Sequence, residues 1–156
     1  MKLCLGAGNA PMADAVNHDI VKHRPEINVA HDLNILPWPW PDNSFDLVVA
    51  YSVLEHLRMT LIESMGEIWR ILKPDGMVCV KAPYWNHARS WQDPTHYWRF
   101  DPTTFDIFDE KTQYGAYYTY YMERKWQIIR PAELSPGKSS IFCDLKALKP
   151  QSNGRG

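Results

Sequence analysis

The sequence is poor in the features that mark several common protein classes. It has three cysteines, Cys4, Cys79 and Cys143, each in a separate apolar run, so buried thiols are expected rather than disulfides or metal ligands. Neither sign of charge dominates, because 17 Lys and Arg face 18 Asp and Glu, and no basic block is present. The positive surface that proteins use to follow a phosphate backbone is therefore missing, and a nucleic-acid partner is not expected.

Long apolar stretches are missing as well. No run approaches the roughly 18 consecutive apolar residues of a membrane span. The two residues between Met1 and Cys4 are too few for the apolar region of a secretory signal. These absences predict a cytoplasmic protein that acts on a small molecule and not at a membrane.

The composition indicates one ordinary globular domain. The chain has 156 residues, of which 45% are hydrophobic and 22% are charged. A chain of this length is expected to bury about two-thirds of the surface that its unfolded form exposes. We predict a single domain over residues 1–150 and a frayed tail over residues 151–156.

Short apolar runs that end in glycine or polar residues predict a parallel sheet. Five of them cover residues 2–5, 15–19, 27–30, 45–52 and 77–83. Apolar residues at helical spacing predict a helix over residues 60–72, which the sequence "KPDG" would end. Two further strands are expected over residues 125–134 and 141–148.

An aromatic-rich insertion is expected over residues 84–126. This segment holds 14 of the 20 aromatic residues of the chain. That concentration is too high for a surface loop. It predicts a second small core at one end of the sheet, the lid and wall of a substrate pocket, or both.

Groups suited to binding a nucleoside follow four successive predicted strands. Gly6 to Asn9 follow the first, and Asp19, Asp32 and Ser52 follow the next three. In open α/β sheets, ligands bind where parallel strands end. A carboxylate can accept both hydroxyls of a ribose, and glycines let the backbone approach the ligand. A single acid at a strand end is more often a helix cap, so the order of these groups carries the prediction.

A phosphate-containing ligand fits this loop poorly. Pro11 stands where a dinucleotide-binding loop would have its third glycine, and the loop leaves no room for a full crossover helix. A dinucleotide oxidoreductase is therefore disfavoured. A ligand with adenosine at one end and an amino acid at the other needs no phosphate cradle, and S-adenosylmethionine has that form.

Four segments, taken in order, resemble a known family. They are "LGAGNAP", "LPWPWPDNSFDLVVAYSVLEHL", "EIWRILKPDGMVCVKAPYW" and "DPTHYWRFDPTTFDIF". Together they resemble class I S-adenosylmethionine-dependent methyltransferases of type 11, especially a compact subgroup with a shortened first crossover. The resemblance implies an α/β fold: a shortened, Rossmann-like, mostly parallel sheet with a closing antiparallel strand. It also implies S-adenosylmethionine as the cofactor and S-adenosylhomocysteine as its product.

When the cofactor-binding positions of this family are matched to the present sequence, each strand end is assigned a part of the cofactor. The loop over residues 6–9 would lie beside the methionine part, and Asp19 would bind the ribose. The residues after the third strand would flank adenine, and those after the fourth would line the floor near the sulfonium. The implied cofactor-binding residues are Gly6, Ala7, Gly8, Asn9, Asp19, Asp32, Leu33, Tyr51, Ser52 and His56.

The segment "HARSWQDPTHYWRF" offers candidates for acid–base chemistry. Methyl transfer chiefly requires an aligned nucleophile, and a base within hydrogen-bond reach helps when the acceptor is a hydroxyl or an amine. We predict that His96, and after it Asp93, serves as base or orients the acceptor. The same residues also fit a structural turn in which Asp93 bonds its own backbone. His87 with Asp93 and His96 has irregular spacing for a metal triad, so no metal is predicted.

Two functions stay open on these grounds. The first is a methyltransferase that acts by in-line methyl transfer on a small-molecule or glycan-type acceptor, which the near-neutral charge and the aromatic wall favour. The alternative is a protein that binds S-adenosylmethionine without methyltransferase activity, or consumes it by another route. The clustered aromatics would also suit a homo-oligomer in which a second copy covers some of them.

Overall fold

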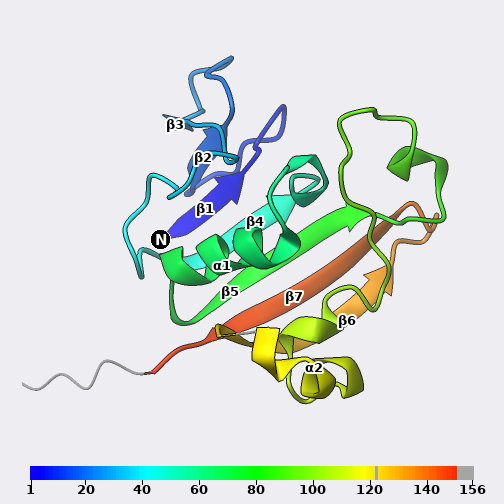
Figure 1. Cartoon of the computed structure of the whole chain (residues 1–156). Helices are drawn as coiled ribbons and strands as arrows, with labels where there is room; N and C mark the ends of the chain where they lie inside the picture. Colours follow the sequence, from blue (N-terminus) through cyan, green and yellow to red (C-terminus); the bar gives the residue numbers. More distant parts are fainter. Residues whose placement is uncertain (122, 151–156) are drawn as a thin grey trace, which may run out of the picture.

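The computed structural model describes residues 1–121 and 123–150, and the predicted tail at 151–156 lies outside the described residues. One seven-stranded sheet runs through the molecule in the order β3-β2-β1-β4-β5-β7-β6 (Figure 1). Its first five strands are parallel, and β7 is antiparallel to both of its neighbours. The strands are β1 (Lys2–Leu5), β2 (Val16–Asp19), β3 (Val29–Ala30), β4 (Phe45–Tyr51), β5 (Leu72–Pro83), β6 (Lys125–Leu134) and β7 (Ser140–Leu148).

One helix of three turns accompanies this sheet. Helix α1 (Leu61–Ile71) begins with a capping box in which Thr60 and Glu63 exchange hydrogen bonds, as its sequence favours. The other helical segments are short: η1 (Leu54–His56), η2 (Ala88–Ser90), η3 (Asp106–Phe108), α2 (Gln113–Tyr117) and η4 (Thr119–Tyr121). None of the helices in the described part of the chain is long and apolar enough to cross a membrane.

The first two crossovers contain no helix. Residues 6–15 join β1 to β2, and residues 20–28 join β2 to β3, as turns and irregular backbone. Only the connection from β4 to β5 carries a full helix, α1, which lies across these two strands (Figure 1). The predicted α/β fold and its shortened first crossover are confirmed.

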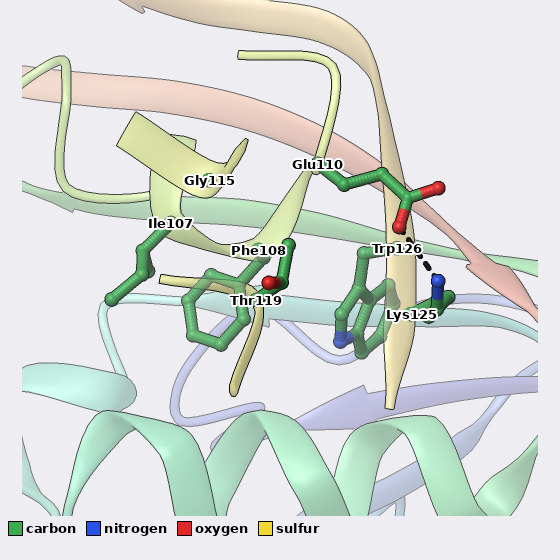
Figure 2. A pocket seen from close by; sticks show the side chains of 7 residues that line it. All are labelled: Ile107, Phe108, Glu110, Gly115, Thr119, Lys125 and Trp126. Carbon is green, nitrogen blue, oxygen red and sulfur yellow. Dashed lines mark hydrogen bonds and ion pairs between the residues drawn. The ribbon is translucent and has the colours of Figure 1, made fainter. Parts of the chain in front are cut away.

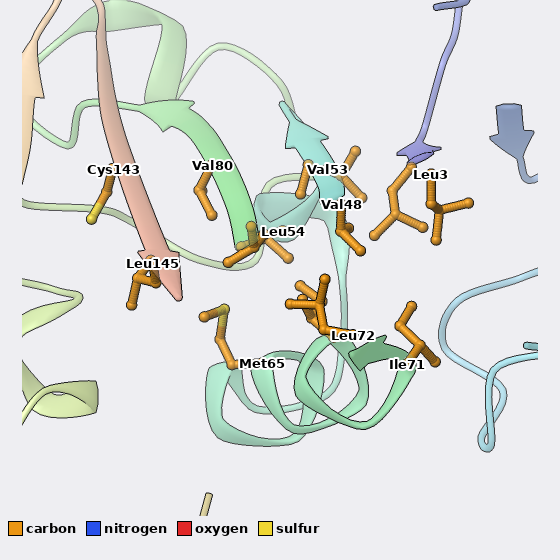
Figure 3. Packing of buried hydrophobic residues seen from close by; sticks show 14 of the residues in the cluster. Leu3, Val48, Val53, Leu54, Met65, Ile71, Leu72, Val80, Cys143 and Leu145 are labelled. Atoms are coloured by element: carbon orange, nitrogen blue, oxygen red, sulfur yellow. The ribbon is translucent and has the colours of Figure 1, made fainter. Parts of the chain in front are cut away.

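The core lies on one face of the sheet. In β5 and β7, Val78, Val80, Cys143 and Leu145 are fully buried, whereas the residues between them, such as Cys79, are only half-buried. Figure 3 shows Met65 of α1 packed towards this buried face. All three cysteines are free thiols, as expected, with Cys4 and Cys143 buried.

The sequence "KPDG" does not form the predicted helix stop. Helix α1 ends at Ile71, and β5 begins at the next residue, before "KPDG". Phe45 pairs with Leu72 and Leu47 pairs with Met77, so the four residues form an irregularity within the β4–β5 ladder. Strand β3 is also shorter than predicted and begins at Val29, with Ile27 buried beside it.

The aromatic-rich segment divides between core and surface. Phe100, Phe105, Phe108 and Trp126 are buried and join the main core, so the described residues of this segment build no core of their own. The expectation that the segment is too aromatic to lie at the surface is wrong for half of its rings. The exposed ones are Trp85, Trp91, Tyr97, Tyr114, Tyr117, Tyr120 and Tyr121.

Candidate functional site

A cleft opens at the carboxyl ends of β1, β2 and β4. Its volume is about 480 Å³, within the range of about 300–1,000 Å³ that small-molecule sites occupy. It therefore lies where ligands bind in open α/β sheets. The residues that line it are Gly6, His18, Asp19, Ile20, His31, Asp32, Leu33, Asn34, Ser52, Val53, His56, Leu57 and Thr95.

Gly6 and Asp19 form the start of the first wall, which we define as residues 6–34. Gly6 has φ +56°, and a Cβ there would lie 2.5 Å from Cγ2 of Val53, so the position requires glycine. The Gly8 N–H donates to Asp19 Oδ2 at 2.8 Å, and the Ile20 N–H donates to Oδ1 at 2.7 Å. These bonds fix the carboxylate, and each oxygen keeps a further lone pair for a ligand.

Asp32 and Leu33 continue the first wall. The backbone N–H of Asn34 donates to Asp32 Oδ1 at 2.9 Å and lowers the pKa of that carboxyl below its usual value, so Asp32 is ionised at neutral pH. Leu33 is only 5% exposed, and its carbonyl accepts a hydrogen bond from Nε1 of Trp38. The wall thus places a carboxylate beside an apolar surface.

Helix α1 is bonded to the segment that directly follows the first wall. Glu67 accepts from the Trp38 N–H at 2.8 Å and from Arg70, whose guanidinium also donates to the carbonyls of Trp38 and Trp40. Burial would raise the pKa of Glu67, but its bonds to Arg70 and to the Trp38 N–H hold it below the usual value. The ionised pair therefore ties the chain after β3 to the helix.

His18 is a further residue of the first wall that the sequence analysis does not assign. Its ring is 2% exposed, with Nδ1 3.4 Å from the Gly6 N–H and Nε2 2.8 Å from the His31 carbonyl. Because the Gly6 N–H donates to Nδ1, the hydrogen of the neutral ring lies on Nε2. Burial lowers the pKa of His18, which favours this neutral form. No sequence signal distinguishes it from an ordinary strand residue.

Glu55 is the buried residue of the second wall, which we define as residues 52–57 with 93–96. Its side chain is 1% exposed, and neither carboxylate oxygen has a hydrogen-bond partner among the described residues. Burial raises the pKa of Glu55 to about 7. Its own carbonyl accepts from the Tyr97 N–H at 2.7 Å, which brings the loop after β5 against η1.

A chain of hydrogen bonds orients two imidazoles in the second wall. Asp93 Oδ1 accepts from the Thr95 hydroxyl at 2.7 Å, and Thr95 Oγ1 lies 2.9 Å from His56 Nδ1. The His56 and His96 rings meet edge to face at 4.7 Å, and His96 Nδ1 lies 3.3 Å from the Ser90 carbonyl. Bonds from Thr95 also lower the pKa of Asp93, so Asp93 stays ionised and is a weak base. The Thr95 backbone N–H also donates to Asp93 Oδ1 at 2.8 Å, so the predicted Asp93 turn is present.

The cleft gathers six of the ten predicted cofactor residues and leaves out four. The lining includes Gly6, Asp19, Asp32, Leu33, Ser52 and His56. Tyr51 points away and packs on Phe142, Ala7 is buried, and Asn9 bonds Arg24. Gly8 acts through its bond to Asp19. Of the predicted acid–base residues, neither Asp93 nor His96 lines the cleft, although Thr95 between them does.

A second hollow lies beside α2 and β6. Phe108 and Trp126 face into it, and the Glu110–Lys125 ion pair closes one side at 2.7 Å (Figure 2). Its volume is about 60 Å³, far below that of a site for a nucleoside. Two larger hollows, of about 540 Å³ beside α2 and about 360 Å³ between α1 and Tyr120, lie away from the carboxyl ends of the parallel strands. The cleft between the two walls lies at those ends and is therefore the candidate site.

Solved structures share this architecture. The YcgJ protein from Bacillus subtilis has a TM-score of 0.62 and 14% identity over 96% of this chain and 92% of its own. A phosphoethanolamine N-methyltransferase from Haemonchus contortus, solved with phosphoethanolamine and S-adenosylhomocysteine, has a TM-score of 0.66 and 13% identity over 97% of this chain and 40% of its own. The fold is thus that of the class I methyltransferases.

Sequence comparisons point to the same family. Residues 6–80 match the family model of a methyltransferase domain. A probable S-adenosylmethionine-dependent methyltransferase from Mycolicibacterium smegmatis is 36% identical over 59 residues, which are 38% of this chain and 22% of that protein. The matches cover 17% to 22% of the lengths of the curated relatives. The predicted resemblance to class I S-adenosylmethionine-dependent methyltransferases is confirmed.

Proposed function

We propose that this chain binds S-adenosylmethionine in the cleft and transfers its methyl group to a small-molecule or glycan-type acceptor. The observation that carries this proposal is the cleft itself, in which Gly6, Asp19 and Asp32 meet at three adjacent strand ends. These residues fit the cofactor: the backbone of Gly6 lines the cleft without a side chain, and two carboxylates face a space of about 480 Å³. The bound cofactor supplies a methyl group on a sulfonium, which is an excellent leaving group.

The first wall would hold the nucleoside. Asp19, already oriented by the N–H groups of Gly8 and Ile20, would accept the two ribose hydroxyls with its remaining lone pairs. Asp32 would accept from the exocyclic amine of adenine, and the buried side chain of Leu33 would contact the ring. Gly6 and Ser52, which line the cleft, would lie towards the methionine end.

The second wall would hold the acceptor. His56 lines the cleft, and His96 packs on it from behind, so both imidazoles lie close to an acceptor bound between the walls. His96 is the proposed base or orienting group. Asp93 would act as a positioning residue, because its low pKa makes it a poor base and its bond to Thr95 orients His56. An in-line transfer then depends mainly on alignment.

A second candidate function follows from the missing crossover helices. A helix after β1 would add N-terminal amides at the carboxyl end of the sheet, and residues 6–15 contain none. A protein shortened in this way would bind S-adenosylmethionine without methylating an acceptor, or would consume it by another route.

Calorimetry with two ligands tests the cofactor, and a labelling assay separates the two functions. Titration with S-adenosylhomocysteine should release heat with one site per chain, whereas nicotinamide adenine dinucleotide should not bind. Heat from the dinucleotide alone would overturn the proposal. Incubation with methyl-labelled cofactor and a cell extract should move label into a small-molecule or glycan fraction. Retention of all label on the cofactor would favour the second candidate function, binding of S-adenosylmethionine without methyl transfer.

A further inference from the structure

The proposed function gives His96 a role as base or orienting group, but it does not explain why Glu55 and His56 cluster with His96. One potential ligand atom from each of the three lies within 4.8 Å of the other two. The residues come from η1 and from the loop after β5, and the bond from the Tyr97 N–H to the Glu55 carbonyl holds these segments together. The cluster is thus built by the fold and not by one flexible loop.

The carboxylate of Glu55 is the first reason to expect a ligand. It is buried and has no hydrogen-bond partner among the described residues, and none of their Lys or Arg side chains forms an ion pair with it. Buried charged groups are normally paired or coordinate a metal ion. A cation between Glu55 and the imidazoles would supply the missing partner.

The hydrogen bonds of the two histidines are the second reason. The Thr95 hydroxyl donates its only hydrogen to Asp93, so towards His56 the oxygen accepts, and Nδ1 of His56 carries the hydrogen. The Ser90 carbonyl can only accept, so Nδ1 of His96 is also the donor. In both neutral rings the lone pair therefore lies on Nε2, and the nearest Asp93 oxygen, Oδ2, is 3.8 Å from Nε2 of His96, beyond hydrogen-bond distance. Orientation by such outer partners is typical of metal-binding histidines.

We propose that Glu55, His56 and His96 bind one divalent transition-metal ion beside the cleft. Two imidazole nitrogens and one carboxylate oxygen suit Zn²⁺, Co²⁺ or Fe²⁺ better than Ca²⁺ or Mg²⁺. Bond lengths of about 2.0–2.2 Å place such ligand atoms roughly 3–3.5 Å apart. Side-chain shifts of about 1 Å would bring the three to that spacing.

The site would have an open position towards the acceptor. Three protein ligands leave a tetrahedral ion one free position, and His56 lines the cleft. That position fits an oxygen of the acceptor, which would make the acceptor a hydroxyl or carboxylate compound. This last assignment rests on the proposed function, with His96 in its orienting role and not as the base, because its Nε2 would bind the metal. Metal binding itself does not rest on the proposed function.

Titration of the metal-free full chain with Co²⁺ tests the site directly. We expect one Co²⁺ per chain and the visible absorption of a four- or five-coordinate ion. Glu55→Gln and His96→Ala should each weaken binding by about 100-fold or more, because loss of an outer partner alone typically costs 10–100-fold. His87→Ala, which removes an imidazole of the same loop outside the cluster, should bind as the parent does.

Three outcomes would overturn the proposal. They are no binding by the parent chain, equal affinity in the parent and both cluster variants, or a thiolate charge-transfer band that places Co²⁺ on a cysteine. Circular dichroism shows whether Glu55→Gln folds, and His96→Ala, which alters a less buried residue, gives a second independent readout. Titration of S-adenosylhomocysteine in chelator tests the cofactor cleft separately, so failure of one proposal does not imply failure of the other.

Discussion

The two walls of the cleft differ in how their carboxylates are bonded. In the first wall, the two carboxylates that line the cleft are fixed by backbone N–H groups: Asp19 by those of Gly8 and Ile20, and Asp32 by that of Asn34. In the second wall, Glu55 is buried without a partner, and the imidazoles beside it are held in place by Thr95 and the Ser90 carbonyl. The first wall is complete without a cation and suits neutral hydroxyls. The second lacks a positive charge.

The bonds of Glu67 join α1 to the segment that follows the first wall. Breaking them should lower the free energy of unfolding more than any other change considered below. Glu67→Ala leaves Arg70 without its buried partner and the Trp38 N–H without an acceptor, and should lower the free energy of unfolding by about 3 kcal/mol. Glu63→Ala, at the exposed start of the same helix, should lower it by about 1 kcal/mol. Urea unfolding measures both. Equal losses would show that the Glu67 pair is not a special anchor.

Removing the central carboxylate of the first wall should act on ligand affinity. Asp19→Ala deletes two hydrogen bonds to a charged acceptor and should weaken S-adenosylhomocysteine binding by about 100-fold. Asp19→Asn keeps the shape and one acceptor oxygen, and should lose about 10-fold. Glu26→Ala removes an exposed acid from the β2–β3 connection and should bind as the parent does. Calorimetry that shows unchanged affinity in Asp19→Ala would remove Asp19 from the site.

Replacing the buried carboxylate of the second wall should stabilise the fold and leave ligand affinity unchanged. Glu55→Met replaces an unpartnered buried carboxylate by an apolar side chain of similar size, and should raise the free energy of unfolding by about 2 kcal/mol in the presence of a chelator. Its affinity for S-adenosylhomocysteine should stay within about twofold, since Glu55 does not line the cleft. Unfolding in urea with EDTA tests the first point. A strong destabilisation would mean that the carboxylate already has a partner.

The smallest expected effect is the change of stability with pH that His18 causes. Burial holds its pKa below the usual value, while the hydrogen bond to the His31 carbonyl and the charge of Asp19 act against this shift. The unfolded state therefore takes up the proton first, and stability falls as pH drops below about 6.5, the ordinary histidine value. His18→Gln should flatten this part of the profile. Thermal unfolding between pH 5 and 8 measures it, and identical slopes in parent and variant would contradict the assignment.

The sheet could be predicted from the sequence because its signals are local. Apolar runs ending in polar residues mark β1, β2 and β4 to within a residue, and helical spacing marks α1. The "KPDG" segment was harder to assign, because proline and glycine predict a stop for the helix but say nothing about a strand that begins before them. The number of aromatic residues in segment 84–126 predicts more buried rings than the structure has, because a count of rings does not show which of them face solvent.

The first wall could be predicted because each of its groups follows a strand directly in the sequence. The second could be predicted only in part. The metal triad that the sequence analysis considered used His87, but the fold turns His87 towards the Arg89 N–H and brings Glu55 to His96 instead. That pairing joins segments separated by 40 residues and depends on the Tyr97–Glu55 backbone bond, which no sequence pattern encodes. Tyr51 lies on the far side of its strand for the related reason that strand residues alternate in direction.

A crystal structure of the chain with S-adenosylhomocysteine tests the central claim most directly. The account predicts the ribose hydroxyls at hydrogen-bond distance from Asp19, adenine beside Leu33, and the sulfur towards the second wall. Density for the ligand outside this cleft, or an Asp19 carboxylate turned away from the ribose, would contradict it.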